Sequence, residues 1–239
     1  MASCMRSVMA RAMGGDPLYR LLAWLSPSYP VGAFSYSHGV ETAVEEGLIR
    51  DRVSLVAWLD SVLRRGTGAV DGALFAASWR AATEGDWPLF DGIAQRATAW
   101  RGTSEMALES RQQGGSFLSI TRTAWPHPAL DEVHQRLDGE LALPVAVALA
   151  ASVHGIALET ALSGYLHAFT ANLISAALRT VPLGQTDGQI ALAALEASVG
   201  DTVRTAVAVE SLDDVGTATP LLDWCSLRHE TQYTRLFRS

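Results

Sequence analysis

Near the start of the chain, three side chains that could bind a metal ion recur at helical spacing. His38, Glu41 and Glu45 lie three and four residues apart, so one face of a helix would carry all of them. An imidazole with two carboxylates suits a hard or borderline metal ion. The same spacing fits a simpler role, in which the acids stabilise the positive end of the helix dipole and His38 lies at its polar boundary. The residues alone leave both interpretations open.

A second set of polar side chains lies in the most apolar part of the chain. Its members recur at steps of four, four and three along one predicted helix, and they are Glu159, Ser163, His167 and Thr170. Bulky apolar residues between Leu158 and Leu173 occupy another face of the same helix. The stripe is therefore expected to form hydrogen bonds between packed helices or to face solvent.

The motifs of common enzyme classes are absent from the sequence. Ser35 and Ser37 do not lie in a GxSxG turn, and no histidine or acid can be assigned to activate them. There is no GxxxxGK[ST] loop to hold nucleotide phosphates and no HExxH metal motif. Cys4 and Cys225 are the two cysteines, and their separation argues against a disulfide framework or a structural zinc site and favours a reducing compartment. These absences give no support for a bound nucleotide or for stable metal storage, so no stably bound cofactor is expected.

Composition restricts the partners of the chain. With 239 residues, of which 49% are hydrophobic, it can bury one large core. The formal net charge of -7 argues against nucleic-acid binding, which needs clustered positive charge.

The segment 141–184 is predicted to form the central core helices, because it is small, apolar and almost free of charge before Arg179. Its first half has the length and polarity of a membrane span. However, Pro144, His154 and Glu159 interrupt it, and no aromatic belt or flanking positive cluster is present. A helix buried in a soluble bundle fits better, so no membrane association is expected.

The rest of the sequence predicts further amphipathic helices and no strand. Their expected ranges are 16–25, 53–65, 70–83, 88–100, 104–123 and one long helix from 186 or 187 to 209. Gly114 and Gly115 lie inside one of them, which predicts close packing or a kink. The expected fold is an all-α, single-domain bundle of about eight to ten helices over residues 16–239, after a disordered leader at residues 1–15.

Two segments fall outside this helical pattern. Residues 26–41 contain Pro27, Pro30 and Gly32 and predict a shaped loop that enters a helix. Residues 221–239 form a tail that mixes aromatic side chains with arginine, as interface hot spots do. The tail is expected either to dock, against its own chain or against a partner, or to be disordered in solvent as terminal residues commonly are.

Four segments, in chain order, resemble the urease accessory protein UreF family. They are LLAWLSPSYPVGAFSYSHGVE (21–41), ESRQQGGSFL (109–118), LRTVPLGQ (178–185) and HETQYTRLFRS (229–239). The resemblance spans nearly the whole chain. It implies an all-α, cytoplasmic homodimer that acts in urease maturation as a scaffold rather than as an enzyme.

The resemblance also implies partners. UreF proteins connect UreD, also called UreH, with the GTPase UreG, and the assembly delivers nickel to apo-urease. Regulation of GTP hydrolysis on UreG by the scaffold is a further expectation. Carried onto this sequence, the UreD-binding candidates lie in the tail and are Tyr233, Arg235, Leu236, Phe237 and Arg238. Candidates for another partner-facing surface come from the N-terminal signature and are Tyr36, Ser37, His38, Gly39 and Glu41.

Two other hypotheses remain beside the scaffold, and a third concerns how the scaffold would work. The protein could be a nickel-binding metallochaperone in its own right, through His38 with Glu41 or through His154 with His167. It could be a helical hydrolase that uses Ser35 and a distant histidine. Within the scaffold role, nickel could pass through a water-filled path in the dimer, lined by the stripe from Glu159 to Thr170.

Overall fold

The computed structural model describes residues 16–239, and every regular element in this range is a helix, which confirms the all-α prediction. The leader predicted at residues 1–15 lies outside the described residues. The α-helices are α2 (Pro17–Trp24), α3 (Val40–Glu45), α4 (Arg52–Arg65), α5 (Thr67–Glu84), α6 (Trp87–Ala99), α7 (Ser104–Ala124), α8 (Pro128–Arg136), α9 (Leu143–Val153), α10 (Leu158–Ala177), α11 (Gln185–Ala194), α12 (Glu196–Ala208) and α13 (Pro220–His229). Two short 3₁₀ helices are η1 (Ala33–Ser35) and η2 (Leu212–Asp214).

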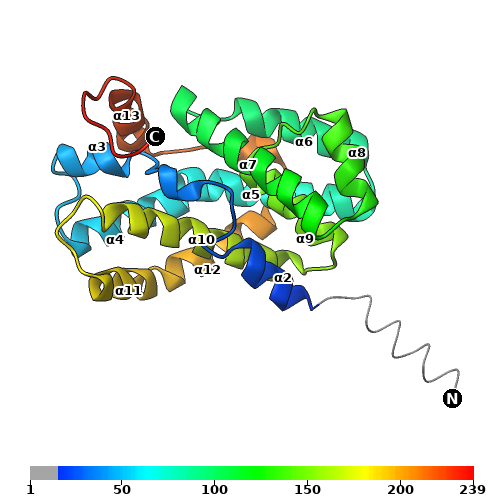
Figure 1. The fold of residues 1–239 in the computed structure, drawn as a ribbon, viewed down its shortest axis with the longest axis horizontal. Coiled ribbons are helices and arrows are strands. Elements are labelled where there is room, and N and C mark those ends of the chain that lie inside the picture. The colour runs from blue at the N-terminus through cyan, green and yellow to red at the C-terminus, as the bar shows by residue number, and fades with distance from the viewer. Residues whose placement is uncertain (1–15) are drawn as a thin grey trace, which may run out of the picture.

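The centre of the molecule is built on α5, α9 and α10. The last two lie in the segment 141–184, which was predicted to form the central core helices. α9 is buried along its whole length from Pro144 to Ala151 and packs against α5, α7 and α10 (Figure 1). Its alanines and valines are small, so neighbouring backbones approach closely and leave few voids. No helix among residues 16–239 combines the length and the hydropathy needed to cross a membrane.

Gly114 shows how close this packing is. α7 runs through Gly114 and Gly115 as one continuous helix, so the close packing predicted there is confirmed. A Cβ atom on Gly114 would lie 2.0 Å from the carbonyl oxygen of Leu141, in the segment that leads into α9. Only glycine allows the backbones of the two segments to meet at this point.

Local capping places the starts of several helices near their predicted positions. Asp51 caps α4 by accepting a hydrogen bond from the Ser54 amide at 2.8 Å, and Asp86 caps α6 through the Leu89 amide. The predicted long helix to residue 209 is wrong, because the chain breaks at the buried Leu195 into α11 and α12. The break lets α12 pack against α5 while α11 packs against α4.

The two regions that the sequence set apart meet at one end of the molecule. α13 packs against α3, and the tail after α13 lies beside the chain that leads into α3 (Figure 1). α2 lies toward the other end of the molecule. This arrangement brings residues 26–41 and 229–239 together.

Candidate functional site

The segment before α3 turns sharply so that its polar side chains point inward. Gly32 has φ +77° and Gly39 has φ +77°, values that favour glycine. His38 also lies in the left-handed region, with φ 55°, which is uncommon for a residue other than glycine. The turn directs the His38 ring to α7 and starts α3 with Glu41 in its first turn. His38 and Glu41 therefore do not share a helix face, contrary to the predicted alignment with Glu45.

The tail docks against this segment through backbone hydrogen bonds. The Ser37 amide donates to the carbonyl oxygen of Ser239 at 3.0 Å, and the Arg238 amide donates to that of Ser35 at 2.9 Å. The Ser37 hydroxyl also donates to Ser239. Of the alternatives left open for the tail, docking against its own chain is the one that the structure shows.

Glu41 is the centre of the docked tail. One carboxylate oxygen accepts a hydrogen bond from the Leu236 amide at 2.7 Å, and the other accepts one from the Phe237 amide at 3.0 Å. The second oxygen also lies 3.1 Å from Nε2 of His229, the last residue of α13. On the other side of that ring, Nδ1 lies 2.8 Å from Glu105 of α7. The His229 ring is fully buried between the two acids.

A second histidine and acid hold the end of the tail. Nδ1 of His38 lies 3.2 Å from Glu109, and Nε2 lies 2.7 Å from the Thr67 hydroxyl. The Ser239 hydroxyl donates to the same oxygen of Glu109 at 2.7 Å. Glu105 and Glu109, four residues apart on α7, thus each face one histidine, and both pairs contact residues 229–239.

The charge state of Glu109 follows from its neighbours. Burial acts to raise its pKa, but the charge and hydrogen bond of His38, the Ser239 hydroxyl and the charge of Arg101 outweigh burial and lower the pKa below the usual 4.5. The carboxylate is therefore ionised at neutral pH and accepts from both partners.

An acid titration should detect this contribution. The stabilisation from a carboxylate with a lowered folded-state pKa is complete above 4.5 and is lost as pH falls through the lower value. We expect Glu109→Gln to be less stable than the wild type at about pH 7 and to lose less stability than the wild type between about pH 5 and pH 3. Urea unfolding at each pH measures this. Equal losses for both proteins would contradict the assignment, and Glu45→Gln, on the exposed face of α3, is the control.

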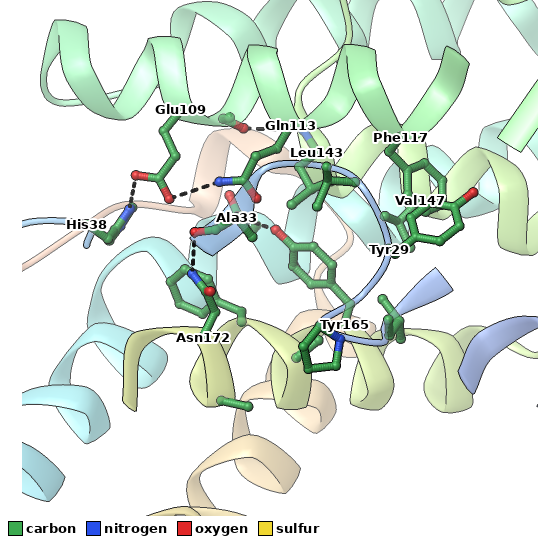
Figure 2. Close-up of a pocket in the computed structure, with 18 of the residues that line it drawn as sticks. Tyr29, Ala33, His38, Glu109, Gln113, Phe117, Leu143, Val147, Tyr165 and Asn172 are labelled. Carbon is green, nitrogen blue, oxygen red and sulfur yellow. Dashed lines mark hydrogen bonds and ion pairs between the residues drawn. The ribbon is translucent and has the colours of Figure 1, made fainter. Parts of the chain in front are cut away.

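Beside this cluster lies a cavity of about 250 Å³ between α7, α9 and α10, shown in Figure 2. Tyr29, Phe117 and Val147 form part of an apolar wall, and His38 and Glu109 lie at the polar end.

A buried ion pair is part of the lining of the cavity. Arg101 Nη2 lies 2.8 Å from Asp71, and each side chain is 6% exposed. The Tyr165 hydroxyl donates to Asp71 at 2.7 Å. Burial and then the Asp71 charge raise the pKa of Tyr165 well above 10, so the hydroxyl keeps its proton. The Nε atom of Arg101 is buried without a hydrogen-bond partner among the described residues.

The predicted partner-binding residues divide into a buried group and an exposed group. Buried side chains are Tyr36, Ser37, His38, Glu41 and Phe237. Exposed side chains are Tyr233, Arg235, Leu236 and Arg238. The candidates from the N-terminal signature therefore do not form a surface in the chain alone, and any part they have in partner binding would act through the tail that they hold.

The tail directly follows α13, a helix that carries exposed apolar side chains of its own. Tyr233 is fully exposed and Leu236 is 61% exposed. Leu221, Trp224 and Leu227 recur every three residues on α13 and are also exposed, while Leu222 and Cys225 are buried. Together the five exposed side chains of α13 and the tail define what we call the tail surface.

The polar stripe on α10 crosses from surface to interior. Glu159 and His167 are exposed, Ser163 is half-buried and Thr170 is buried. Thr170 donates to the Leu166 carbonyl of its own helix, and only His167 of the four lines the cavity. The metal path along the stripe stays a prediction.

The candidate metal ligands have other partners. His38 faces Glu109 and Thr67, whereas Glu41 faces His229. Arg20 and the Trp125 carbonyl oxygen contact the His154 ring. Within residues 16–239 there is no group of three or more His, Cys, Asp or Glu side chains placed to hold a metal ion.

Four residues of the site were not predicted from the sequence, because they lie far along the chain from the loop and the tail that the sequence set apart. These are Asp71, Arg101, Glu105 and Arg179. Arg179 lies between two rings, 3.8 Å from the centroid of Phe34 and 4.2 Å from that of Phe237. The available signal was in α7, where two glutamates four residues apart lie on the helix face that also carries Met106 and Gln113.

Comparison with known proteins agrees with the segments described above. The family model of UreF matches residues 49–196. Urease accessory protein UreF of Granulibacter bethesdensis is 50% identical over 230 residues, covering 95% of each chain. The proteins of the same name from Rhodopseudomonas palustris (strain BisB5) and Methylorubrum populi are also 50% identical, over 93% and 92% of this chain and 91% and 98% of theirs. With a family match over more than half its length and relatives this similar, the chain belongs to the UreF family of urease accessory proteins.

Proposed function

We propose that the protein is a non-enzymatic scaffold in urease maturation. In this role a homodimer connects UreD, or UreH, with the GTPase UreG, regulates GTP hydrolysis on UreG, and so promotes nickel insertion into apo-urease in the cytoplasm. The names of the relatives support the link to urease. The resemblance of the four sequence segments supports the partners.

The observation that carries the proposal is the tail surface. Tyrosine and tryptophan are typical of interface hot spots, and here they are exposed on a base that is internally hydrogen-bonded. A rigid base reduces the entropy lost on binding, because the loop is already ordered. Exposed apolar side chains gathered on one face are more typical of a protein interface than of a free surface.

Substitutions in the tail surface test the proposal. Tyr233→Ala with Leu236→Asp should weaken binding to UreD or UreG by at least about tenfold and lower urease activation accordingly, because two central contacts are lost. Both side chains are exposed, so the free energy of unfolding should change by less than about 0.5 kcal/mol. The measurement is co-purification and urease activity in cells that carry a urease gene cluster without its own UreF gene.

Leu89→Asp is the matched control, since Leu89 is 51% exposed on α6, toward the other end of the molecule. Normal activation by the tail variant would contradict a role of this surface. Failure of the wild-type chain to restore activation, with both partners present, would contradict the scaffold function itself.

Direct nickel binding is the rival function, and calorimetry on the purified protein separates the two. A scaffold should show no tight, stoichiometric nickel site, whereas a metallochaperone should show one.

A further inference from the structure

The position of His229 restricts the number of protons on its ring. Each ring nitrogen lies at hydrogen-bond distance from a different carboxylate, at 3.1 Å from Glu41 and 2.8 Å from Glu105. A neutral imidazole has one N–H donor, and an ionised carboxylate has none. Two hydrogen bonds to two carboxylates therefore require the imidazolium form, with a proton on each nitrogen.

The local charges agree with this form. The charged groups that face the site are Glu41 from α3, Glu105 from α7, Arg235 from the tail, whose Nη1 atom lies 3.0 Å from Glu105, and Arg179, whose charge acts on Glu41. The His229 ring lies within hydrogen-bond distance of both carboxylates. A neutral ring could donate to one of them alone and would leave the other facing a buried nitrogen without a proton, which is unfavourable in a region shielded from water.

Glu41 connects this ring to the tail. The oxygen that faces His229 also accepts the hydrogen bond from the Phe237 amide, and the other oxygen accepts that from Leu236. The orientation of the carboxylate therefore sets the path of the backbone at residues 236 and 237. That path places Leu236 outward on the tail surface and Phe237 inward against Arg179.

We infer that His229 is a positioning residue: its ring is held as a buried imidazolium between Glu41 and Glu105, and its charge fixes Glu41 as the receptor for the tail backbone. The part of the inference that concerns partner binding rests on the proposed scaffold function. The part that concerns the tail does not depend on any partner.

Spectroscopy of the full wild-type chain tests the charge of the ring. Nitrogen NMR on protein labelled at histidine should show both ring nitrogens of His229 protonated at neutral pH. His229→Gln identifies the signal by its disappearance. One unprotonated ring nitrogen would overturn the inference.

Hydrogen exchange tests the positioning. His229→Gln should speed exchange of the Leu236 and Phe237 amides at least tenfold, because the neutral side chain removes the positive charge between Glu41 and Glu105 and the two acids then repel each other. Glu105→Gln added to His229→Gln removes that excess charge and should restore most of the protection. Glu45→Gln, an exposed acid on the same helix as Glu41, should leave it unchanged. Unchanged protection in His229→Gln, or no recovery in the double variant, would overturn the inference.

Binding to UreD and UreG separates this inference from the proposed function. Tyr233→Ala should weaken binding while the Leu236 and Phe237 amides stay protected from exchange. His229→Gln should weaken both the binding and the protection. The variant with His229→Gln and Glu105→Gln should recover the binding and the protection. If protection follows the charge but binding never changes, the positioning of the tail is supported and the partner role of the tail surface is overturned.

Discussion

Replacing Gly114 with alanine is expected to destabilise the folded protein by about 3 kcal/mol or more, as severe overpacking does. The new methyl group would lie 2.0 Å from the carbonyl oxygen of Leu141 and 2.7 Å from backbone atoms of Ala142 and Leu143. These are backbone atoms at the entrance to α9, so no side chain can rotate away. α7 and α9 would have to separate at the centre of the molecule.

The matched control is Gly92→Ala, in the interior of α6. A Cβ atom there meets nothing within 4 Å, so the change should stabilise the helix by up to about 1 kcal/mol. Urea or thermal unfolding of the two variants measures both values. A Gly114→Ala protein as stable as the wild type would show that α7 and α9 do not pack as described.

The second large effect is expected at the buried ion pair in the lining of the cavity. Arg101→Met should cost about 3–5 kcal/mol, because it leaves the Asp71 carboxylate buried without its partner. Adding Asp71→Leu removes that uncompensated charge and should recover much of the loss. Double-mutant analysis of urea unfolding gives the coupling between the two residues.

Arg204→Met is the control for this experiment. Arg204 is 73% exposed and pairs with Asp201 on the surface of α12. Its loss should change the free energy of unfolding by less than about 0.5–1 kcal/mol. If the double variant is no more stable than Arg101→Met alone, the pair does not act as a unit.

The helices could be predicted from the sequence because their signals are local. α4 was expected at 53–65 and occupies Arg52–Arg65, since Asp51 and Ser54 close the capping box within four residues. Pro144 and the absence of charge likewise indicated the buried α9. The break at Leu195 has no such local signal, because neither glycine nor proline marks it.

The site could be predicted only in part. The sequence drew attention to His38, Glu41 and the tail, but it grouped His38 with Glu41 and Glu45 on one helix. In the structure His38 faces Glu109, 71 residues away, and Glu41 faces His229, 188 residues away. Such pairings depend on tertiary packing, and no periodicity within one segment reports them.

The docking of the tail has a consequence for synthesis of the protein. Ser37 and its partner Ser239 are separated by 202 residues, so the first emerges from a ribosome long before the second. At about 5–20 residues per second, the wait is about 10–40 seconds. During that time Glu41 and Glu109 lack the partners that the tail supplies. A nascent chain therefore cannot hold the tail surface in place until residue 239 has left the ribosome, and only then can it offer that surface to a partner.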